Sequence, residues 1–233
     1  MGAWTSVRFS RSMAAASSIA DGMPVSVETA REPHLGYHLL KRMLDITVAI
    51  AVIMITMPIW LIAAVAIIVE SGRPVLFRQE RLGHLGRRFV CIKFRTMVPD
   101  AESRMHEAMR AAAVEGPEFK RALDPRVTRL GRLLRAWSVD ELPQLINVLR
   151  GEMSVVGPRP IAAWEAEYQG HGWRRLAVKP GLTGTWQISG RSQIGWDARM
   201  LLDVEYVDKR SLGGDIGIIL RTPWAILARR GAV

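Results

Sequence analysis

An uncharged, apolar run from Ile46 to Val69 constrains the fold of this chain more than any other feature of its sequence. A helix of about 24 residues, rising roughly 1.5 Å per residue, is long enough to cross the apolar core of a bilayer. Pro58 lies near the middle of the run, where a proline removes a backbone hydrogen bond and clashes with the preceding turn. It divides the run into two arms of about eleven or twelve residues, each too short to cross alone.

Basic residues flank this run on both sides. Lys41 and Arg42 precede it, and five arginines follow it closely, namely Arg73, Arg78, Arg81, Arg87 and Arg88. A spanning helix would place one basic flank outside the cell, against the positive-inside tendency, whereas a helix that bends at Pro58 and returns keeps both flanks inside. Both arrangements remain open, and the charges favour the re-entrant one.

The chain is predicted to have three segments. Residues 1–36 are rich in Ser, Ala and Met, show no sustained period and are expected to form a mobile N-terminal tail. Residues 37–72 are expected to form the re-entrant membrane helix. Residues 73–233 are long enough for one sizeable domain, placed at the cytoplasmic face.

Composition narrows the classes of partner. A formal net charge of +10 and a pI near 10.7 indicate an anionic partner, which could be nucleic acid, lipid headgroups or a phosphorylated substrate. Nucleic acid is disfavoured, because three Tyr and five Phe form no pattern of aromatic residues interleaved with basic ones. Cys91 is the only cysteine, which excludes an internal disulfide, and no two His are spaced as a zinc-binding pair.

Asp140 and Glu141 stand side by side just before an apolar helical face formed by Leu142, Leu145, Ile146 and Leu149. A helix N-terminus stabilises negative charge, and Mg²⁺ relieves the repulsion between two carboxylates when it is shared with substrate phosphates. The other interpretation is structural. Ser138 and Glu141 have the spacing of a capping box, in which each satisfies the other's backbone donor. Local sequence leaves both open.

Four motifs make a family resemblance specific: Leu76–Gly83 (LFRQERLG), Lys93–Met97 (KFRTM), Ser138–Pro160 and Lys179–Arg191 (KPGLTGTWQISGR). From about Lys41 onward the chain resembles the bacterial sugar transferases of the monotopic phosphoglycosyl transferase superfamily. Members of that family move a sugar-1-phosphate from a nucleotide diphosphate sugar onto polyprenyl phosphate. The resemblance implies the re-entrant helix, although a Ser often precedes the proline there and this chain has Met57.

The resemblance also implies roles for individual residues. Asp140 would attack the β-phosphorus of a UDP-sugar to give an aspartyl-phosphosugar, and Glu141 would hold Mg²⁺, with Mn²⁺ as an alternative. Phe89–Met97 is predicted to be a strand whose alternation puts Lys93 and Arg95 on one face. The candidate ligands of substrate phosphate or nucleotide are Lys93, Arg95, Arg135, Arg159, Gln187 and Arg191.

The predicted fold class is α+β, mostly helical with a small β element, attached to the membrane by the re-entrant helix and by amphipathic surface helices. One such helix has Leu130, Leu133, Leu134 and Trp137 as its apolar stripe, a pattern that also suits packing on a domain core. Asp203, Glu205 and Asp208 surround Tyr206 and indicate only a polar helical face.

The expected activity is transfer of a hexose-1-phosphate from UDP-glucose or UDP-galactose to polyprenyl (undecaprenyl) phosphate, which starts exopolysaccharide or other glycan assembly. The expected location is the cytoplasmic face of a bacterial inner membrane, in contact with membrane lipids. A non-catalytic membrane scaffold of a polysaccharide assembly complex and a membrane-attached nucleic-acid-binding protein are the alternatives. The sequence leaves open whether the chain forms a homo-oligomer.

Overall fold

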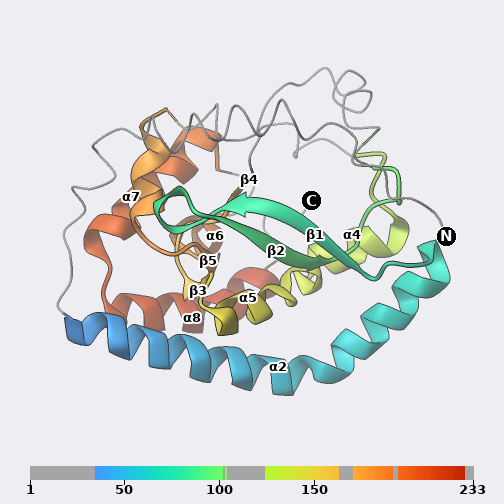
Figure 1. The fold of residues 1–233 in the computed structure, drawn as a ribbon, viewed down its shortest axis with the longest axis horizontal. Helices are drawn as coiled ribbons and strands as arrows, with labels where there is room; N and C mark the ends of the chain where they lie inside the picture. Colours follow the sequence, from blue (N-terminus) through green and yellow to red (C-terminus); the bar gives the residue numbers. More distant parts are fainter. Residues whose placement is uncertain (1–34, 102, 104–123, 163–169, 191–193, 229–233) are drawn as a thin grey trace.

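The computed structural model describes residues 35–101, 103, 124–162, 170–190 and 194–228. The fold is mixed helix and strand and mostly helical, as predicted, and the other described elements lie on one side of a long N-terminal helix, α2 (Figure 1). The predicted N-terminal tail lies outside the described residues, except for Leu35 and Gly36, which open α2.

Helix α2 runs from Leu35 to Ser71 without interruption and bends near its middle (Figure 1). Pro58 lies inside it and accounts for the bend, because prolines are the usual cause of sharp helix kinks. The hydroxyl of Thr56 donates to the carbonyl of Val52 at 2.7 Å and accepts from the indole N–H of Trp60 at 3.1 Å. A hydroxyl bound to the carbonyl four residues earlier also favours bending, so the proline and the threonine act together.

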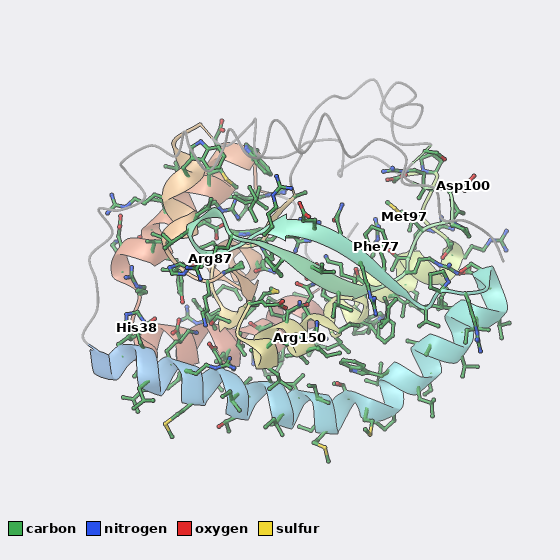
Figure 2. The ribbon with its side chains drawn as sticks, in the orientation of Figure 1. His38, Phe77, Arg87, Met97, Asp100 and Arg150 are labelled. Carbon is green, nitrogen blue, oxygen red and sulfur yellow. The ribbon has the colours of Figure 1, made fainter. Side chains whose placement is uncertain are left out.

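The side of α2 that faces away from the domain is apolar and exposed. Figure 2 shows its side chains projecting away from the rest of the fold. In the most apolar 18-residue window only 11% of residues are buried, and the helix is long and apolar enough to cross a membrane. An exposed apolar surface of this extent needs apolar surroundings. The large exposed side chains include Met54, Ile55, Leu61, Ile62 and Val69.

Buried polar contacts fix the first arm of α2 to the domain. The ammonium of Lys41 lies 3.3 Å from Oδ1 of Asp45 and 3.1 Å from Oδ2 of Asp215, and the phenol of Tyr206 donates to Oδ1 of Asp215 at 2.8 Å. Asp45 also accepts a hydrogen bond from the hydroxyl of Ser154 at 2.9 Å. Because these groups are buried and paired, the position of the helix against the domain is specified by polar contacts as well as by packing.

The described part of the domain contains a three-stranded and a two-stranded sheet. Strands β1 (Leu76–Leu82) and β2 (Arg88–Phe94) form an antiparallel hairpin, joined through the short 3₁₀ helix η2 (His84–Gly86), and β4 (Ile161–Ala162) pairs with the other edge of β1. Strand β3 (Ser154–Val156) pairs in parallel with β5 (Gly181–Thr183).

Seven helical elements complete the described part of the chain besides α2 and η2. They are α4 (Arg129–Ala136), η4 (Val139–Glu141), α5 (Gln144–Arg150), η6 (Gly170–Ala177), α6 (Thr185–Ser189), α7 (Trp196–Lys209) and α8 (Leu212–Leu227). Helix α4 packs Leu134 against the second arm of α2 while Leu133 stays 56% exposed. Part of its apolar stripe therefore packs on other elements, and contact of the exposed part with a membrane stays a prediction. Helix α8 exposes Leu220 and Trp224.

Helix α5 is tied to the hairpin by a fully buried amide. The side-chain oxygen of Asn147 accepts from the backbone N–H of Ile92 at 3.1 Å, and its NH₂ donates to the carbonyl of Val90 at 2.7 Å. Leu145 and Val148 pack beside it in the main core, with Cys91 of β2. This bridge holds the strand that carries Lys93 against the helix that follows the acidic pair.

We expect Asn147→Ala to lower the melting temperature by roughly 5–15 °C, because it leaves the buried Ile92 N–H and the partly buried Val90 carbonyl without their side-chain partner. Thermal unfolding of the detergent-solubilised protein is the measurement. Ser189→Ala is the matched control, since it removes a single exposed hydrogen bond. An unchanged melting temperature for Asn147→Ala would show that this bridge contributes nothing to stability.

Candidate active site

The acidic pair lies in a tight turn rather than in a helix. Asp140 and Glu141 belong to η4, and α5 begins only at Gln144. Ser138, just before the turn, has left-handed backbone angles (φ 56°, ψ 21°), and its side chain makes no cap hydrogen bond to η4. The capping box that its spacing with Glu141 suggested is therefore not formed, and the Glu141 side chain is engaged elsewhere.

Two cations bind the same oxygen of Glu141. The ammonium of Lys93, from the end of β2, lies 2.7 Å from Oε1, and Nη2 of Arg159, from the loop between β3 and β4, lies 2.9 Å from it. Burial raises the pKa of Glu141, but Arg159 and Lys93 outweigh burial and hold it well below its usual range. Glu141 is therefore ionised, and it joins three segments that are far apart in the sequence.

Asp140 has a different environment. Its residue is 8% exposed, and it accepts no hydrogen bond within the part of the chain that the structure describes. Burial and the neighbouring Glu141 charge raise its pKa, against the opposing effect of Lys93, Arg135 and Arg159. The site thus pushes the pKa values of two adjacent carboxyls apart, which is how neighbouring acids acquire different chemical roles.

Arg135 approaches the pair from α4. Its Nε donates to the hydroxyl of Thr96 at 2.9 Å, which fixes the guanidinium beside the site. Burial lowers the pKa of Arg135, and the charge of Asp140 raises it again. Lys93, Arg135 and Arg159 are therefore the predicted cations that the structure gathers around the two acids.

Arg95 is placed elsewhere. Strand β2 ends at Phe94, and Nη2 of Arg95 donates to the carbonyls of Ser71 and Gly72 at 2.8 and 2.6 Å, at the C-terminal end of α2. A cation there satisfies helix-end carbonyls and complements the helix dipole. Ile92 and Phe94 are buried on one face of the strand, as the alternation indicates, but the Arg95 side chain does not join Lys93 because it binds the C-terminal end of α2.

The loop that carries Arg159 is held close to β5 by glycines. A Cβ on Gly157 would lie 2.6 Å from the carbonyl oxygen of Lys179, and one on Gly181 would lie 2.1 Å from the amide nitrogen of Gly157. A Cβ on Gly184 would meet the Gly157 carbonyl oxygen at 2.5 Å. The glycines of the Pro180–Gly184 loop thus serve close backbone packing, which sets the approach of the Arg159 loop.

Gln187 stands behind this loop in α6. Its NH₂ donates to the Leu182 carbonyl at 3.0 Å, and its buried Oε1 has no hydrogen-bond partner among the described residues. The structure brings Gln187 to the end of β5 and records no contact with the acidic pair. The prediction for Arg191 lies outside the described residues.

Two residues of this region were missed by the sequence reasoning. Arg81, inside the first family motif, is buried and donates to the carbonyl of Pro160 at 3.0 Å. Arg175 donates to the carbonyl of Arg159 at 2.7 Å. Each supports the backbone of the Arg159 loop from a distant segment. Arg81 could have been found because it lies in a family motif, whereas no local sequence pattern marks Arg175.

The two carboxylates of the acidic pair could supply only part of the coordination of a divalent cation. Among the described residues no three His, Cys, Asp or Glu side chains come together. Asp140 and Glu141 alone supply one or two carboxylates, and Oε1 of Glu141 already has two cationic partners. Mg²⁺ is commonly held by one or two carboxylates and substrate phosphates. The pair therefore suits an ion shared with a phosphorylated substrate rather than one enclosed by protein.

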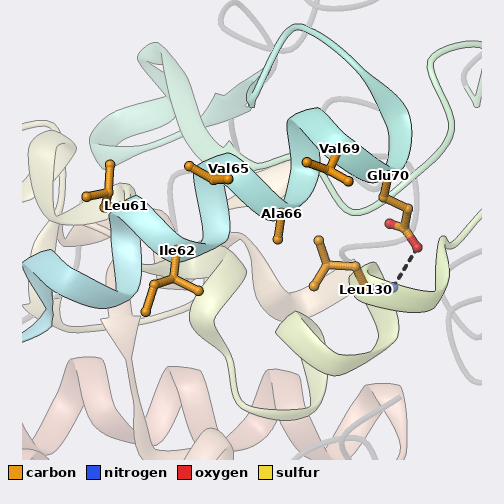
Figure 3. Close-up of a pocket in the computed structure, with 7 residues that line it drawn as sticks. All are labelled: Leu61, Ile62, Val65, Ala66, Val69, Glu70 and Leu130. Atoms are coloured by element: carbon orange, nitrogen blue, oxygen red, sulfur yellow. Dashed lines mark hydrogen bonds between the residues drawn. The ribbon is translucent and has the colours of Figure 1, made fainter.

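An apolar groove of about 610 Å³ lies between the second arm of α2 and α4 (Figure 3). Glu70 closes one end, where its Oε1 accepts the backbone N–H of Leu130 at 2.9 Å and so ties the two helices together. Neither acid of the pair nor its cations line the groove. The lining residues are Leu61, Ile62, Val65, Ala66, Val69, Glu70 and Leu130.

Comparison with known proteins identifies the family of this chain. The sequence model of the family described as "Bacterial sugar transferase" matches residues 36–229. The chain is 41% identical over 198 residues to the UDP-galactose-lipid carrier transferase of Erwinia amylovora, covering 83% of this chain and 41% of that protein. It is 40% identical over 197 residues to the exopolysaccharide production protein ExoY of Sinorhizobium fredii, covering 82% and 87%.

A third relative is the UDP-glucose:undecaprenyl-phosphate glucose-1-phosphate transferase of Caulobacter vibrioides, 39% identical over 212 residues, with 86% of this chain and 74% of that protein covered. The chain thus spans about two fifths of some curated relatives and most of the length of others. The match to the family covers nearly all of the described residues, from the first turn of α2 to α8. The chain belongs to the bacterial sugar transferase family, whose members are associated with the membrane.

Proposed function

We propose that this protein transfers a hexose-1-phosphate from a UDP-sugar to polyprenyl (undecaprenyl) phosphate, through a covalent intermediate on Asp140, and so initiates exopolysaccharide or other glycan assembly. The observation that carries the proposal is the buried acidic pair with three cations around it. Their environment raises the pKa of Asp140 and lowers that of Glu141. The names of the relatives from Erwinia and Caulobacter support the class of donor and acceptor.

In the first step, an Asp140 carboxylate oxygen forms a bond to the β-phosphorus of the UDP-sugar. The bond from that phosphorus to the bridging oxygen breaks, and UMP leaves with that oxygen. In the second step, a phosphate oxygen of the polyprenyl phosphate bonds to the same phosphorus, and the bond to Asp140 breaks, which regenerates the carboxylate. A raised pKa makes Asp140 the more basic acid of the two and the better nucleophile once ionised.

The neighbouring residues have separate tasks in this scheme. Lys93, Arg135 and Arg159 would stabilise the charge on the transferring phosphoryl oxygens, and the planar fork of each arginine suits paired phosphate contacts. Glu141 would hold Mg²⁺ or Mn²⁺, which when bound would neutralise charge on the donor diphosphate. With its low pKa, Glu141 keeps Lys93 and Arg159 in place before substrate arrives.

The test is an assay with radiolabelled UDP-glucose and UDP-galactose, each offered to the detergent-solubilised protein with polyprenyl phosphate. We expect a lipid-linked radioactive product together with UMP, from one of the two donors. The Asp140→Asn variant provides the background. Binding of lipid without UMP release from either donor would instead support the non-catalytic scaffold.

The proposed location is the cytoplasmic face of a bacterial inner membrane, with α2 entering the bilayer and returning. Three features of the chain support it: the bend at Pro58, the exposed apolar side of α2 and the basic residues on both flanks. A polyprenyl phosphate carries its reactive group at the level of the lipid headgroups, so an active site resting on one leaflet meets both a soluble donor and a membrane acceptor.

We expect both ends of α2 to be protected from an impermeant thiol reagent applied outside intact cells. The reporters are Gly36→Cys, where a side chain meets no neighbour within 4 Å, and the isosteric, exposed Ser103→Cys in the domain that follows. A Cys91→Ala background removes the one native thiol, which is buried. Permeabilised cells should label at both positions. Labelling of only one position in intact cells would establish a spanning helix.

A further inference from the structure

A buried ion pair lies behind the Arg159 loop and takes no part in the chemistry described so far. Nη2 of Arg175, on η6, lies 2.6 Å from Oδ2 of Asp203, on α7, and the two side chains are 4% and 1% exposed. Burying two charges costs several kcal/mol per ion, and a well-packed apolar pair in the same place is often neutral or better for stability. The presence of this pair therefore calls for another explanation.

The pair acts on the backbone of one residue. The Nη2 atom that faces Asp203 donates its hydrogen bond to the carbonyl of Arg159 at 2.7 Å. Burial raises the pKa of Asp203 to about 6, while the positive charge of Arg175 and the nearby Arg159 oppose the rise. The ion pair is thus joined to the main chain of Arg159 through Arg175.

The pair is poorly arranged for stability alone. In the described part of the chain, neither oxygen of Asp203 receives an aligned hydrogen bond, and Nε of Arg175 has no hydrogen-bond partner. The Asp203 contact is accordingly an ion pair without hydrogen-bond alignment, whereas the hydrogen bond of Nη2 goes to the Arg159 carbonyl. The same two elements are also joined by packing of Val207 against Leu176 and Ala177, and at the surface by an ion pair of Arg174 with Asp208 at 2.7 Å, so η6 and α7 do not depend on the buried pair for their connection.

Arg159 needs such support. Its side chain is 31% exposed and reaches Nη2 to within 2.9 Å of Glu141, and a long arginine side chain that is partly in solvent loses considerable entropy when it is held in one geometry. Pro158 and Pro160 restrict the backbone on either side, and Arg81 holds the carbonyl of Pro160. Arg175 holds the carbonyl of Arg159 itself, and Asp203 holds the guanidinium of Arg175 in place through the ion pair.

We infer that Asp203 and Arg175 are positioning residues that set the place of Arg159 at the transferring phosphate. The inference rests on the proposed function, since it concerns the efficiency of that reaction. Neither residue touches the reacting atoms. A shift of about 1 Å in a positioning contact costs on the order of 10²-fold in rate, so loss of this support should appear in turnover.

The test is a double-mutant cycle on UMP release with UDP-sugar and polyprenyl phosphate. Asp203→Asn should lower kcat about 10- to 100-fold with a smaller change in KM, because Arg159 acts mainly on the charge that develops during transfer. Arg159→Ala should lower kcat by about 10²-fold or more. The double variant should match Arg159→Ala within about threefold, since residues that act through one another are not additive. Asp208→Asn, which breaks the surface pair of the same elements, should stay within about twofold of wild type.

A second variant covers the case in which Asp203→Asn does not fold. Arg175→Lys keeps a positive charge next to Asp203 but loses the planar fork that serves Asp203 and the Arg159 carbonyl together, so it should reproduce the loss of kcat with a melting temperature close to wild type. The inference would be overturned if the losses of kcat in Asp203→Asn and Arg159→Ala multiplied in the double variant. A wild-type kcat in Arg175→Lys would overturn it as well. A wild-type protein that releases no UMP would overturn the proposed function instead.

Discussion

Asp140→Asn is expected to lower the rate of UMP release by about 10³-fold or more, because it removes the nucleophile while leaving the fold intact. An amide has nearly the shape of the carboxyl, but its oxygen is far too weak a nucleophile to form the acyl phosphate. Asp140 accepts no hydrogen bond among the described residues, so the substitution leaves no described donor unpaired. The measurement is initial-rate UMP release from UDP-sugar with polyprenyl phosphate present.

Asp197→Asn serves as the control for this variant. Asp197 is an exposed acid in the first turn of α7, and its loss should leave the rate within about twofold of wild type. The melting temperatures of both variants should lie near that of the wild type. If Asp140→Asn kept a tenth or more of the wild-type rate, Asp140 could not be the group that bonds to phosphorus.

Glu141→Gln is expected to lower turnover by about 10²-fold or more, the scale on which single electrostatic contacts act at a reacting group. The neutral amide removes the charge that holds Lys93 and Arg159 and, in the proposed mechanism, the metal ligand. Dependence on Mg²⁺ or Mn²⁺ should weaken in this variant, while membrane association stays intact. Titration of activity against metal, with a chelator as the end point, is the measurement.

The pH profile of the same variant gives an independent readout. Asp140 must be ionised to attack, so the rate falls as the pH falls through its pKa. In the metal-free protein, burial and the Glu141 charge raise that pKa, and removal of the charge should lower it, so the acid limb of the residual activity in chelator should lie at lower pH for Glu141→Gln than for the wild type. Glu205→Gln, which breaks an exposed ion pair with Lys209, should leave both the profile and the metal dependence unchanged. Full activity of Glu141→Gln in excess chelator would contradict both assigned roles of Glu141.

The sequence predicted the features that follow from local patterns. The apolar run with Pro58 predicted a long helix that bends near its middle, and the pattern over Phe89–Met97 predicted a strand, which the structure has as β2. Alternation did not predict the burial along this strand, because Phe89 and Cys91 are buried although they alternate in step with Lys93. The cations around Glu141 came from the family resemblance. Spacing alone favoured a capping box, which fails because Ser138 adopts a left-handed conformation that no local propensity rule predicts for a serine.

The features that escaped prediction depend on contacts between distant segments. The Arg95 side chain binds the C-terminal end of α2 rather than the acidic pair, because strand β2 ends one residue before Arg95, and periodicity does not predict where a strand ends. Arg175 and Asp203 are 28 residues apart, and their meeting behind Arg159 requires η6, α7 and the Arg159 loop to be folded together. Asn147 forms the buried bridge between α5 and the hairpin, a contact that no local pattern indicates.

The most direct test of the covalent mechanism is intact-mass spectrometry of the wild-type protein given UDP-sugar without any lipid acceptor, and quenched in acid to preserve an acyl phosphate. The mechanism predicts release of up to one UMP per active site and one added sugar phosphate, located on the peptide that contains Asp140 and absent from Asp140→Asn. Addition of polyprenyl phosphate before the quench should remove the adduct. A protein that never carries the adduct, and releases UMP only when polyprenyl phosphate is present, would contradict the covalent mechanism and indicate direct displacement in a ternary complex.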